Sequence, residues 1–155
     1  MHAILPSAVL LLAPLATTPV LHAQAEERAV MNVVQQLFDG MRARDTARMR
    51  ATLHADARLV SSGVKDSVPT VTVEPVTAWL AGVPNARPGM LLDERLHNPV
   101  VKVDGGLASV WAEYTFYLGD KINHCGVDTF HLVKTTDGWR IIDLADTRRR
   151  EGCAP

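Results

Sequence analysis

The part of the chain after Pro88 constrains the fold most, because it consists of one strand-like segment after another. Four segments are rich in β-branched and aromatic residues: residues 90–103, 107–118, 122–135 and 139–147. Turn residues separate them at 104–106, 119–120 and 137–138. The pattern predicts an antiparallel meander, with a bulge or bend at Asn98-Pro99 because proline cannot donate a hydrogen bond to a sheet ladder.

The preceding residues predict about three helices. Between residues 26 and 44 the apolar residues recur at i, i+3 and i+4 spacing, which indicates an amphipathic helix. Asp45 is expected to cap a second short helix, and residues 74–80 are expected to form a third. Residues 56–61 predict a short strand, and residues 65–72 a loop or irregular strand. The predicted class is therefore α+β, with the helices packed on one face of a curved, mostly antiparallel sheet.

The first residues have the composition of a targeting segment. Residues 4–20 are uncharged and mostly apolar, residues 23–25 fit the small-x-small pattern read by signal peptidase, and the first charged residue is Glu26. Prolines within the run disfavour a membrane-spanning helix. We predict that residues 1–25 are a cleaved secretory signal and that residues 26–155 form one periplasmic or secreted domain without a stable membrane anchor. An uncleaved anchor is the alternative, since no Lys or Arg precedes the run.

The composition excludes several classes of protein. The 155 residues are 47% hydrophobic, which suits a single domain with a sizeable core. Sixteen Lys and Arg residues against 17 Asp and Glu residues give a formal net charge of -1, which argues against a nucleic-acid partner. No His-x-His or Cys-x-x-Cys pair occurs, so the sequence predicts neither a metal site nor a cofactor.

The last hairpin suggests a disulfide. A two-residue turn at Asp137-Gly138 would place Cys125 opposite Arg150, so that Cys153 follows just beyond it. Because an exported protein meets an oxidising environment, we expect a Cys125–Cys153 bridge. Two unlinked thiols are the alternative if the chain stays in the cytosol.

The same register collects aromatic and acidic side chains on one face of the sheet. If residues 119–120 also form a two-residue turn, the shared face carries the predicted ligand-binding residues Trp111, Glu113, Tyr117 and Asp128. Asp146 is then expected on the opposite, solvated face. A one-residue bulge would move every side chain beyond it to the other face, so this assignment depends on regular pairing.

Taken together, these features resemble the nuclear transport factor 2-like superfamily, also called the SnoaL-like or ketosteroid-isomerase-like cone. The resemblance covers nearly all of residues 26–153, and the combination is similar to exported bacterial members of the lumazine-binding type. The resemblance is based on the first predicted helix and on residues 44–46, 56–57, 103–111, 124–130, 137–141, 146–147 and 153. The resemblance implies a curled sheet around a long N-terminal helix, a pocket open at one end, and frequent homodimers. Such folds host both enzymes and non-enzymes, so the fold does not settle the function.

Our leading hypothesis is a protein that binds a small, partly apolar ligand without catalysis. The competing hypothesis is a hydrolase, dehydratase or isomerase that uses acid–base catalysis, with Asp128, Glu113 or His124 as candidate catalytic residues. Asp128 lies between apolar neighbours. Its alternative role is structural, as a carboxylate that is hydrogen-bonded to a backbone amide. A third hypothesis is a structural module that dimerises through its sheet.

Three enzymes of the superfamily provide specific comparisons. An isomerase-like site is disfavoured, because the first predicted helix contains no tyrosine. An epoxide-hydrolase-like site needs an Asp–Arg–Asp trio, for which the residue types are present at Asp93, Arg95, Asp128 and Asp143. A dehydratase-like site needs His, Asp and Tyr, which occur at His97, His124, His131, Asp128, Tyr114 and Tyr117.

Overall fold

The computed structural model describes residues 19–86 and 88–153. Its helices are α1 (Pro19–Ala43), α2 (Thr46–Ala51), α3 (Val76–Gly82) and the short 3-10 helix η1 (Val83–Asn85). Its strands are β1 (Leu53–Lys65), β2 (Val68–Pro75), β3 (Leu92–Asp104), β4 (Leu107–Leu118), β5 (Lys121–Thr135) and β6 (Gly138–Thr147).

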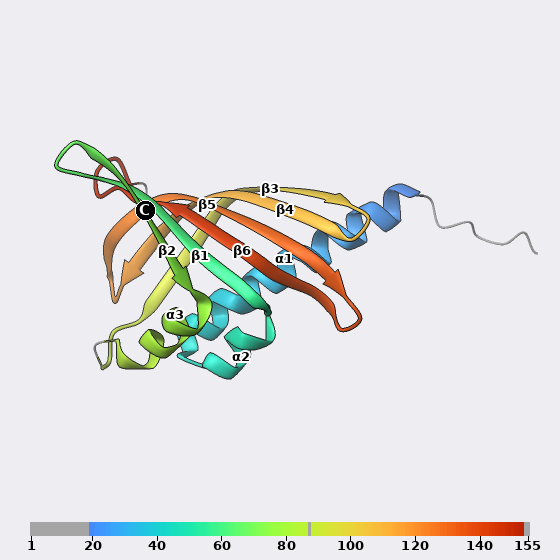
Figure 1. Ribbon diagram of the computed structural model, residues 1–155, viewed down its shortest axis with the longest axis horizontal. Helices are drawn as coiled ribbons and strands as arrows, with labels where there is room; N and C mark the ends of the chain where they lie inside the picture. The colour runs from blue at the N-terminus through green and yellow to red at the C-terminus, as the bar shows by residue number, and fades with distance from the viewer. Residues whose placement is uncertain (1–18, 87, 154–155) are drawn as a thin grey trace, which may run out of the picture.

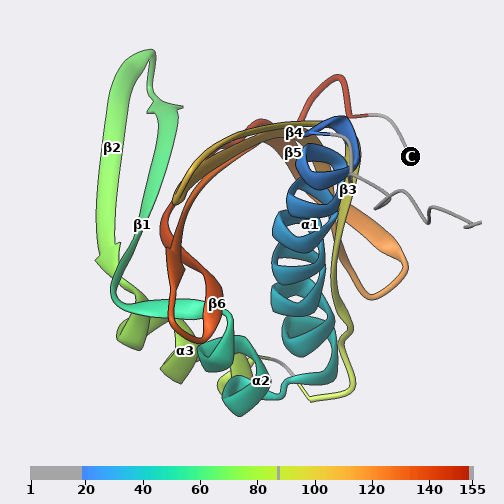
Figure 2. The same cartoon turned by 90° about the vertical axis from the view of Figure 1, so that its right-hand side faces the viewer.

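The strands form one sheet that curls around α1 (Figure 2). The strand order is β2-β1-β6-β5-β4-β3, and only the β1–β6 pair is parallel. The β1–β2 hairpin projects from the body, whereas α2 and α3 lie together at the lower end (Figure 1). The predicted α+β class, with helices packed on a curved and mostly antiparallel sheet, is confirmed.

The core lies between α1 and the concave face of the sheet. The apolar stripe of α1 is buried there, including Val30, Val34, Leu37, Phe38 and Met41. The stripe packs on buried residues of β4, β5 and β6, and the rings of Phe38 and Phe130 meet edge to face at 5.9 Å. Burial of this stripe stabilises α1, because helix propensity alone contributes little in water.

The connection between α1 and α2 follows the predicted capping. The Asp45 carboxylate accepts a hydrogen bond of 2.9 Å from the backbone N–H of Arg48, which satisfies a free donor of α2. Gly40 allows α2 to lie close against α1, since a Cβ at this position would come within 2.8 Å of Met49 Cγ. The helix α1 begins at Pro19, so it overlaps the end of the predicted signal peptide. Residues 1–18 lie outside the described residues.

Residues 65–72, predicted as a loop or irregular strand, lie mostly in strand β2. Asp66 and Ser67 form a two-residue turn between paired Lys65 and Val68, and both have positive φ angles of 51° and 64°. Positive φ at both positions gives a turn whose twist matches that of a hairpin. Pro69 is tolerated because β2 is an edge strand and needs no donor on its outer side.

Two hairpin registers differ from the prediction. The last turn lies at Thr136-Asp137 and not at the predicted Asp137-Gly138, so that Thr135 pairs with Gly138; Ile142 then bulges, and Asp128 lies opposite Asp146. The Gly119-Asp120 turn is as predicted, but Asn123 bulges in β5. Each bulge moves the side chains beyond it to the other face of the sheet. The predicted assignment of side chains to the two faces is therefore wrong.

The predicted disulfide is present despite the change in register. Cys125 and Cys153 are bonded, with their Cα atoms 5.6 Å apart. Cys125 bridges to Arg149 and not to Arg150. The earlier turn alone would bring Arg148 opposite Cys125, and the extra residue at Ile142 moves the pairing to Arg149. Gly152 has a φ of 65°, a conformation that lets the chain bend back toward β5.

Candidate functional site

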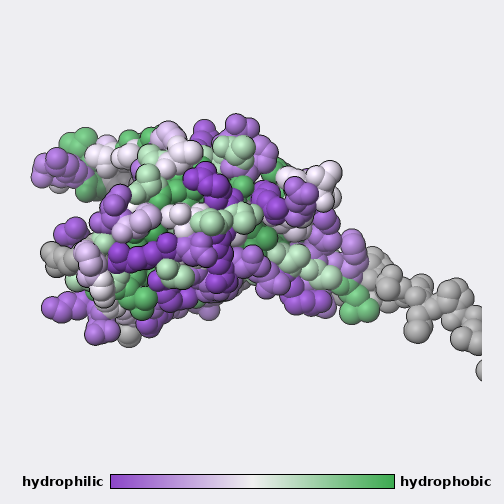
Figure 3. Space-filling model, turned by 90° about the horizontal axis from the view of Figure 1, so that it is seen from below, coloured by the Kyte–Doolittle hydropathy of each residue, from purple (hydrophilic) through white to green (hydrophobic). Residues whose placement is uncertain are grey.

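A cavity of about 350 Å³ opens between the concave face of the sheet and the segment from β2 to η1. Much of its wall is apolar and includes Phe38, Met41, Trp79, Leu92, Phe116 and Leu144. Seen from below, the surface is hollowed between two lobes, and hydrophobic residues show inside the hollow (Figure 3). Its volume lies within the range of about 300–1,000 Å³ that is typical of small-molecule sites.

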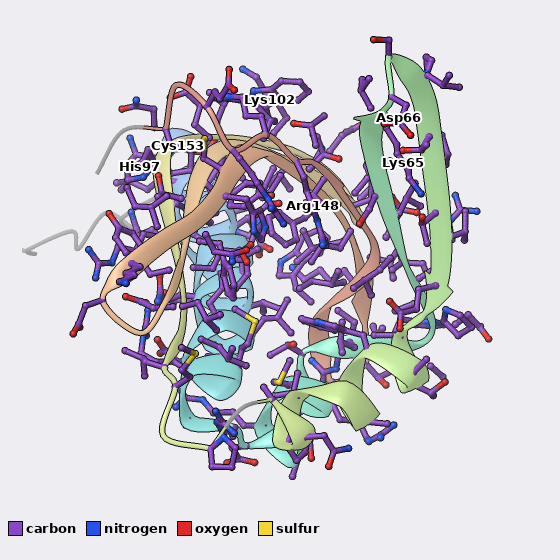
Figure 4. All side chains as sticks on the ribbon, turned by 90° about the vertical axis from the view of Figure 1, so that its left-hand side faces the viewer. Lys65, Asp66, His97, Lys102, Arg148 and Cys153 are labelled. Atoms are coloured by element: carbon purple, nitrogen blue, oxygen red, sulfur yellow. A yellow bond between two sulfur atoms is a disulfide. The ribbon has the colours of Figure 1, made fainter. Side chains whose placement is uncertain are left out.

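Carboxyl groups from three strands meet at this cavity. Glu94 comes from β3, Asp128 from β5 and Asp146 from β6, and the last two are directly opposite each other in the sheet. Asp128 is 1% exposed and Asp146 is 8% exposed. Arg148 follows β6, lies inside the curve of the sheet (Figure 4), and donates a hydrogen bond of 2.5 Å from Nε to Asp146 Oδ2. The cavity therefore combines an apolar wall with a buried acidic cluster.

Glu94 and Asp128 lie close enough to affect each other's protonation. Burial raises the pKa of Glu94 to about 7 and raises the pKa of Asp128 well above its ordinary range. The two carboxyls are hydrogen-bonded, with Asp128 as the donor. This bond favours ionisation of Glu94, whereas Glu94 raises the pKa of Asp128 further. Near neutral pH the pair consequently holds at least one proton.

Tyr114 and Gly126 fix the end of β6 beside this pair. The Tyr114 hydroxyl donates a hydrogen bond of 3.0 Å to the carbonyl oxygen of Thr147 and lies 3.4 Å from Asp146 Oδ2. A Cβ at position 126 would collide with the same carbonyl oxygen, so only glycine permits this approach. The hydroxyl is buried among carboxylates, which raises the pKa of Tyr114 and keeps it protonated.

The ring of His124 forms another part of the wall. It meets Tyr114 edge to face at 5.6 Å and Phe116 at 5.0 Å, and its Nδ1 lies 2.8 Å from Asn123 Oδ1. Burial and the neighbouring Arg148 lower the pKa of His124, so the imidazole is neutral near pH 7.

The structure brings together only some of the predicted site residues. Asp128 and His124 line the cavity, whereas Trp111, Glu113 and Tyr117 do not. Trp111 is 56% exposed on the outer face, and Tyr117 is covered there by Arg95, whose guanidinium lies 4.1 Å from the ring centre. Because Asn123 bulges, Ala112 and not Trp111 shares the face of Asp128. The prediction that these four residues share one face is therefore corrected.

The Asp–Arg–Asp trio does not assemble around Asp128. Asp93 pairs with Arg42 at 2.6 Å and with Arg95 at 2.8 Å, and Asp143 pairs with Arg58 at 2.6 Å. Neither Asp93 nor Asp143 lines the cavity. Of the residue types considered for a dehydratase, His97 contacts Thr115 Oγ1 at 3.1 Å and His131 is exposed beside Asp143.

Three charged residues of the cavity were not predicted as site residues from the sequence: Glu94, Asp146 and Arg148. Glu94 alternates with Leu92 and Leu96, and this period of two could have indicated an acid on the inner face of β3. Asp146 was expected to be solvated, and the bulge at Ile142 places it inside instead. No comparable sequence signal marks Arg148.

Two further observations concern the described part of the chain alone. Within residues 19–86 and 88–153, no cluster of three or more His, Cys, Asp and Glu side chains is arranged to hold a metal ion. In the same residues no helix has the length and apolar character needed to cross a membrane.

Comparison with known proteins gives a family and several solved structures. A family model described as "Putative lumazine-binding" matches residues 25–144. No protein with curated annotation matches the sequence. An NTF2-like protein of unknown function from Shewanella baltica is 19% identical with a TM-score of 0.62, covering 88% of this chain and 100% of that one.

Two other solved structures are similarly distant. A protein of unknown function from Mycobacterium tuberculosis is 17% identical with a TM-score of 0.72, covering 88% of this chain and 79% of that one. A "putative dehydratase" of the NTF2-like family from Streptomyces avermitilis is 17% identical with a TM-score of 0.62, covering 82% and 98%. At these identities the likeness establishes the fold alone.

Proposed function

Because the chain belongs to the "Putative lumazine-binding" family of the NTF2-like superfamily, we propose that it binds a small, partly apolar molecule in the cavity beside Asp128. The observation that carries this proposal is the cavity itself, in which an apolar wall surrounds a few convergent polar groups. That combination is typical of sites that bury a small ligand and orient it.

Native mass spectrometry of the protein, purified without adding any ligand, tests this proposal. A molecule retained in the native spectrum and lost on denaturation supports binding, and its mass gives the ligand class. Ala78→Trp would fill the cavity, since Ala78 lines it, and should abolish retention. Ala81→Trp is the matched control, because Ala81 is exposed on the same helix and does not line the cavity. Equal retention in both variants would place the ligand elsewhere.

A second candidate function is acid–base catalysis by a hydrolase, dehydratase or isomerase. The Glu94–Asp128 pair favours it, since a carboxyl that titrates near neutral pH in a cavity is suited to proton transfer. An enzyme would convert the retained molecule on incubation, and Asp128→Asn would slow that conversion. A molecule recovered unchanged in mass and isomeric form supports binding alone.

We also propose that residues 1–25 are removed on export and that the domain is periplasmic or secreted. Cleavage after Ala25 would shorten α1 and leave the Glu26 contacts intact: Glu26 accepts hydrogen bonds of 2.7 Å from Lys134 Nζ and 2.9 Å from Trp139 Nε1. The Cys125–Cys153 bridge is compatible with an oxidising compartment. The intact mass of protein isolated from the periplasm tests the cleavage.

The superfamily resemblance further supports a homodimer. Exposed apolar side chains on the outer face, including Trp111 and Val100, offer a surface for self-association. Sedimentation velocity across a range of protein concentrations gives the oligomeric state directly. A single monomeric species at all concentrations would contradict this part of the proposal.

A further inference from the structure

Resting on the proposed ligand-binding function, we propose that the ligand is an organic cation, with an ammonium group on an apolar body, held between Asp128 and Asp146. Three features of the cavity favour this class of ligand: the charge of its wall, two buried oxygens, and the apolar surroundings of both.

The charged groups that line the cavity are mostly acidic. Among the described residues, four carboxyls face it, from Glu74 on β2 and from the Glu94, Asp128 and Asp146 cluster, and one guanidinium, that of Arg148. The other described titratable groups that pack against the cluster are His124, which is neutral near pH 7, and Tyr114, which stays protonated. With one proton on the Glu94–Asp128 pair, the described part of the wall still has more negative than positive charges.

Two carboxyl oxygens in this wall are buried without a hydrogen-bond partner among the described residues. They are Asp128 Oδ2 and Asp146 Oδ1. The other oxygen of Asp146 accepts the hydrogen bond from Arg148, so the guanidinium does not satisfy Oδ1. A buried acceptor without a donor costs about 1–3 kcal/mol, and a bound donor would remove that cost.

One ammonium group is able to satisfy both oxygens. Asp128 and Asp146 are directly opposite in neighbouring strands, where Cβ atoms lie about 4.5–5.5 Å apart. An ammonium carries three N–H donors and a positive charge, and it has no lone pair to repel a carboxylate. Charge-assisted hydrogen bonds of this kind are the stronger ones in a low dielectric.

The remaining wall suits an apolar body. Trp79 and Phe116 offer aromatic surface, and Met41 and Leu144 offer aliphatic surface. A flat ring joined to an ammonium by a short linker would place its ring against these side chains and its charge at the acidic cluster. Burial of the ring contributes through the hydrophobic effect, while the carboxylates select the charge.

Isothermal titration calorimetry with matched probes tests the inference. The probes share one ring and differ in charge: 2-naphthylmethylamine, 2-naphthylmethanol and 2-naphthoic acid. Lumazine is added as a heterocycle without a cationic group. At pH 8 we expect the amine to bind at least about tenfold more tightly than the alcohol, because it pairs with a buried carboxylate. We expect the preference to shrink at pH 6, where the Glu94–Asp128 pair takes up a further proton.

Proton release gives a second measurement on the same samples. A bound cation favours the ionised form of the pair, so binding at pH 7 should expel protons. The apparent binding enthalpy of the amine should then depend on the ionisation enthalpy of the buffer, and that of the alcohol should not. An amine enthalpy equal in all buffers would overturn the inference.

The outcomes separate this inference from the proposed function. If the alcohol, the acid or lumazine binds as tightly as the amine, the cation inference is overturned while ligand binding stands. If no probe binds, the inference fails with these ligands, and a molecule retained in the native mass spectrum would show that binding itself survives.

Substitutions test which side chains cause the preference for the cation. The double substitution Glu94→Gln and Asp128→Asn should remove the pH dependence of the cation preference and keep binding of the alcohol. Glu113→Gln is the matched control, because Glu113 is exposed on the outer face and should leave all affinities unchanged. If the double variant does not fold, Glu94→Gln alone and the pH series of the natural protein still decide the question.

Discussion

The two halves of the concave face of β5 and β6 have opposite characters. In one half, Phe130 and Leu132 on β5 and Ile141 on β6 are fully buried beneath α1. In the other half, a few residues along the same strands, Asp128 and Asp146 occupy the equivalent inward positions and face a cavity. The same strands therefore build a core and a candidate site.

The difference shows how each half is held together. The packed half is held by burial of apolar surface against α1. The cavity half is held by directional bonds: the Cys125–Cys153 bridge, the Arg148–Asp146 ion pair and the hydrogen bond from Tyr114 to Thr147. Ionisation of its buried carboxyls lowers the free energy of unfolding. Groups that destabilise the fold in this way are typical of ligand-binding sites.

The largest expected effect comes from the packed half. Phe130→Ala should lower the free energy of unfolding by about 3–5 kcal/mol, because it removes a ring that is fully buried against Phe38. Phe116→Ala, at the half-buried wall of the cavity, should cost less because the cavity already adjoins the ring. Urea denaturation of both variants measures the two losses in the free energy of unfolding. Equal losses would contradict the division of the face into two halves.

Removal of the disulfide should loosen the cavity half selectively. The bond closes a loop of 28 residues, so replacement of Cys125 and Cys153 by serine should lower the free energy of unfolding by about 2–4 kcal/mol. Hydrogen exchange should increase at residues 124–128 and 146–149 and stay slow at residues 130–133. Uniform loss of protection across β5 would mean that the two halves unfold as one unit.

Glu94→Gln should raise stability in a way that depends on pH. Folding raises the pKa of Glu94 from 4.5 to about 7, so its contribution to stability is present below pH 4.5 and is lost as the pH rises toward 7. At pH 8 the natural protein carries a penalty of about 3 kcal/mol, which the variant should largely lack. Urea denaturation at pH 4.5 and pH 8 measures the difference. A gain of equal size at both pH values would contradict burial of an ionisable carboxyl.

The packed half could largely be predicted from the sequence, because its signals are local. The i, i+3, i+4 spacing on α1 and the cap at Asp45 both depend on residues close together in the chain. The turn at Gly119-Asp120 depends on two residues with a strong conformational preference.

The cavity half could be predicted only in part, because its geometry depends on bulges. Asp128 was recognised from its apolar neighbours, and Cys125–Cys153 was recognised despite a register that is wrong by one residue. The side chain of Asp146 was predicted to lie on the solvated face, because nothing in the local sequence shows that Ile142 adds an extra residue to β6. The bulge is chosen by packing across the sheet, which pairs residues that are distant in the chain.

The smallest expected effect is on the outer face, where the sequence placed part of the site. Trp111→Ser should change the free energy of unfolding by no more than about 0.5 kcal/mol, since the side chain is 56% exposed. It should leave the retained ligand and the probe affinities unchanged, because Trp111 does not line the cavity. Native mass spectrometry and calorimetry on this variant measure both. Loss of the ligand with an unchanged fold would instead place the site on the face that regular hairpin pairing predicts.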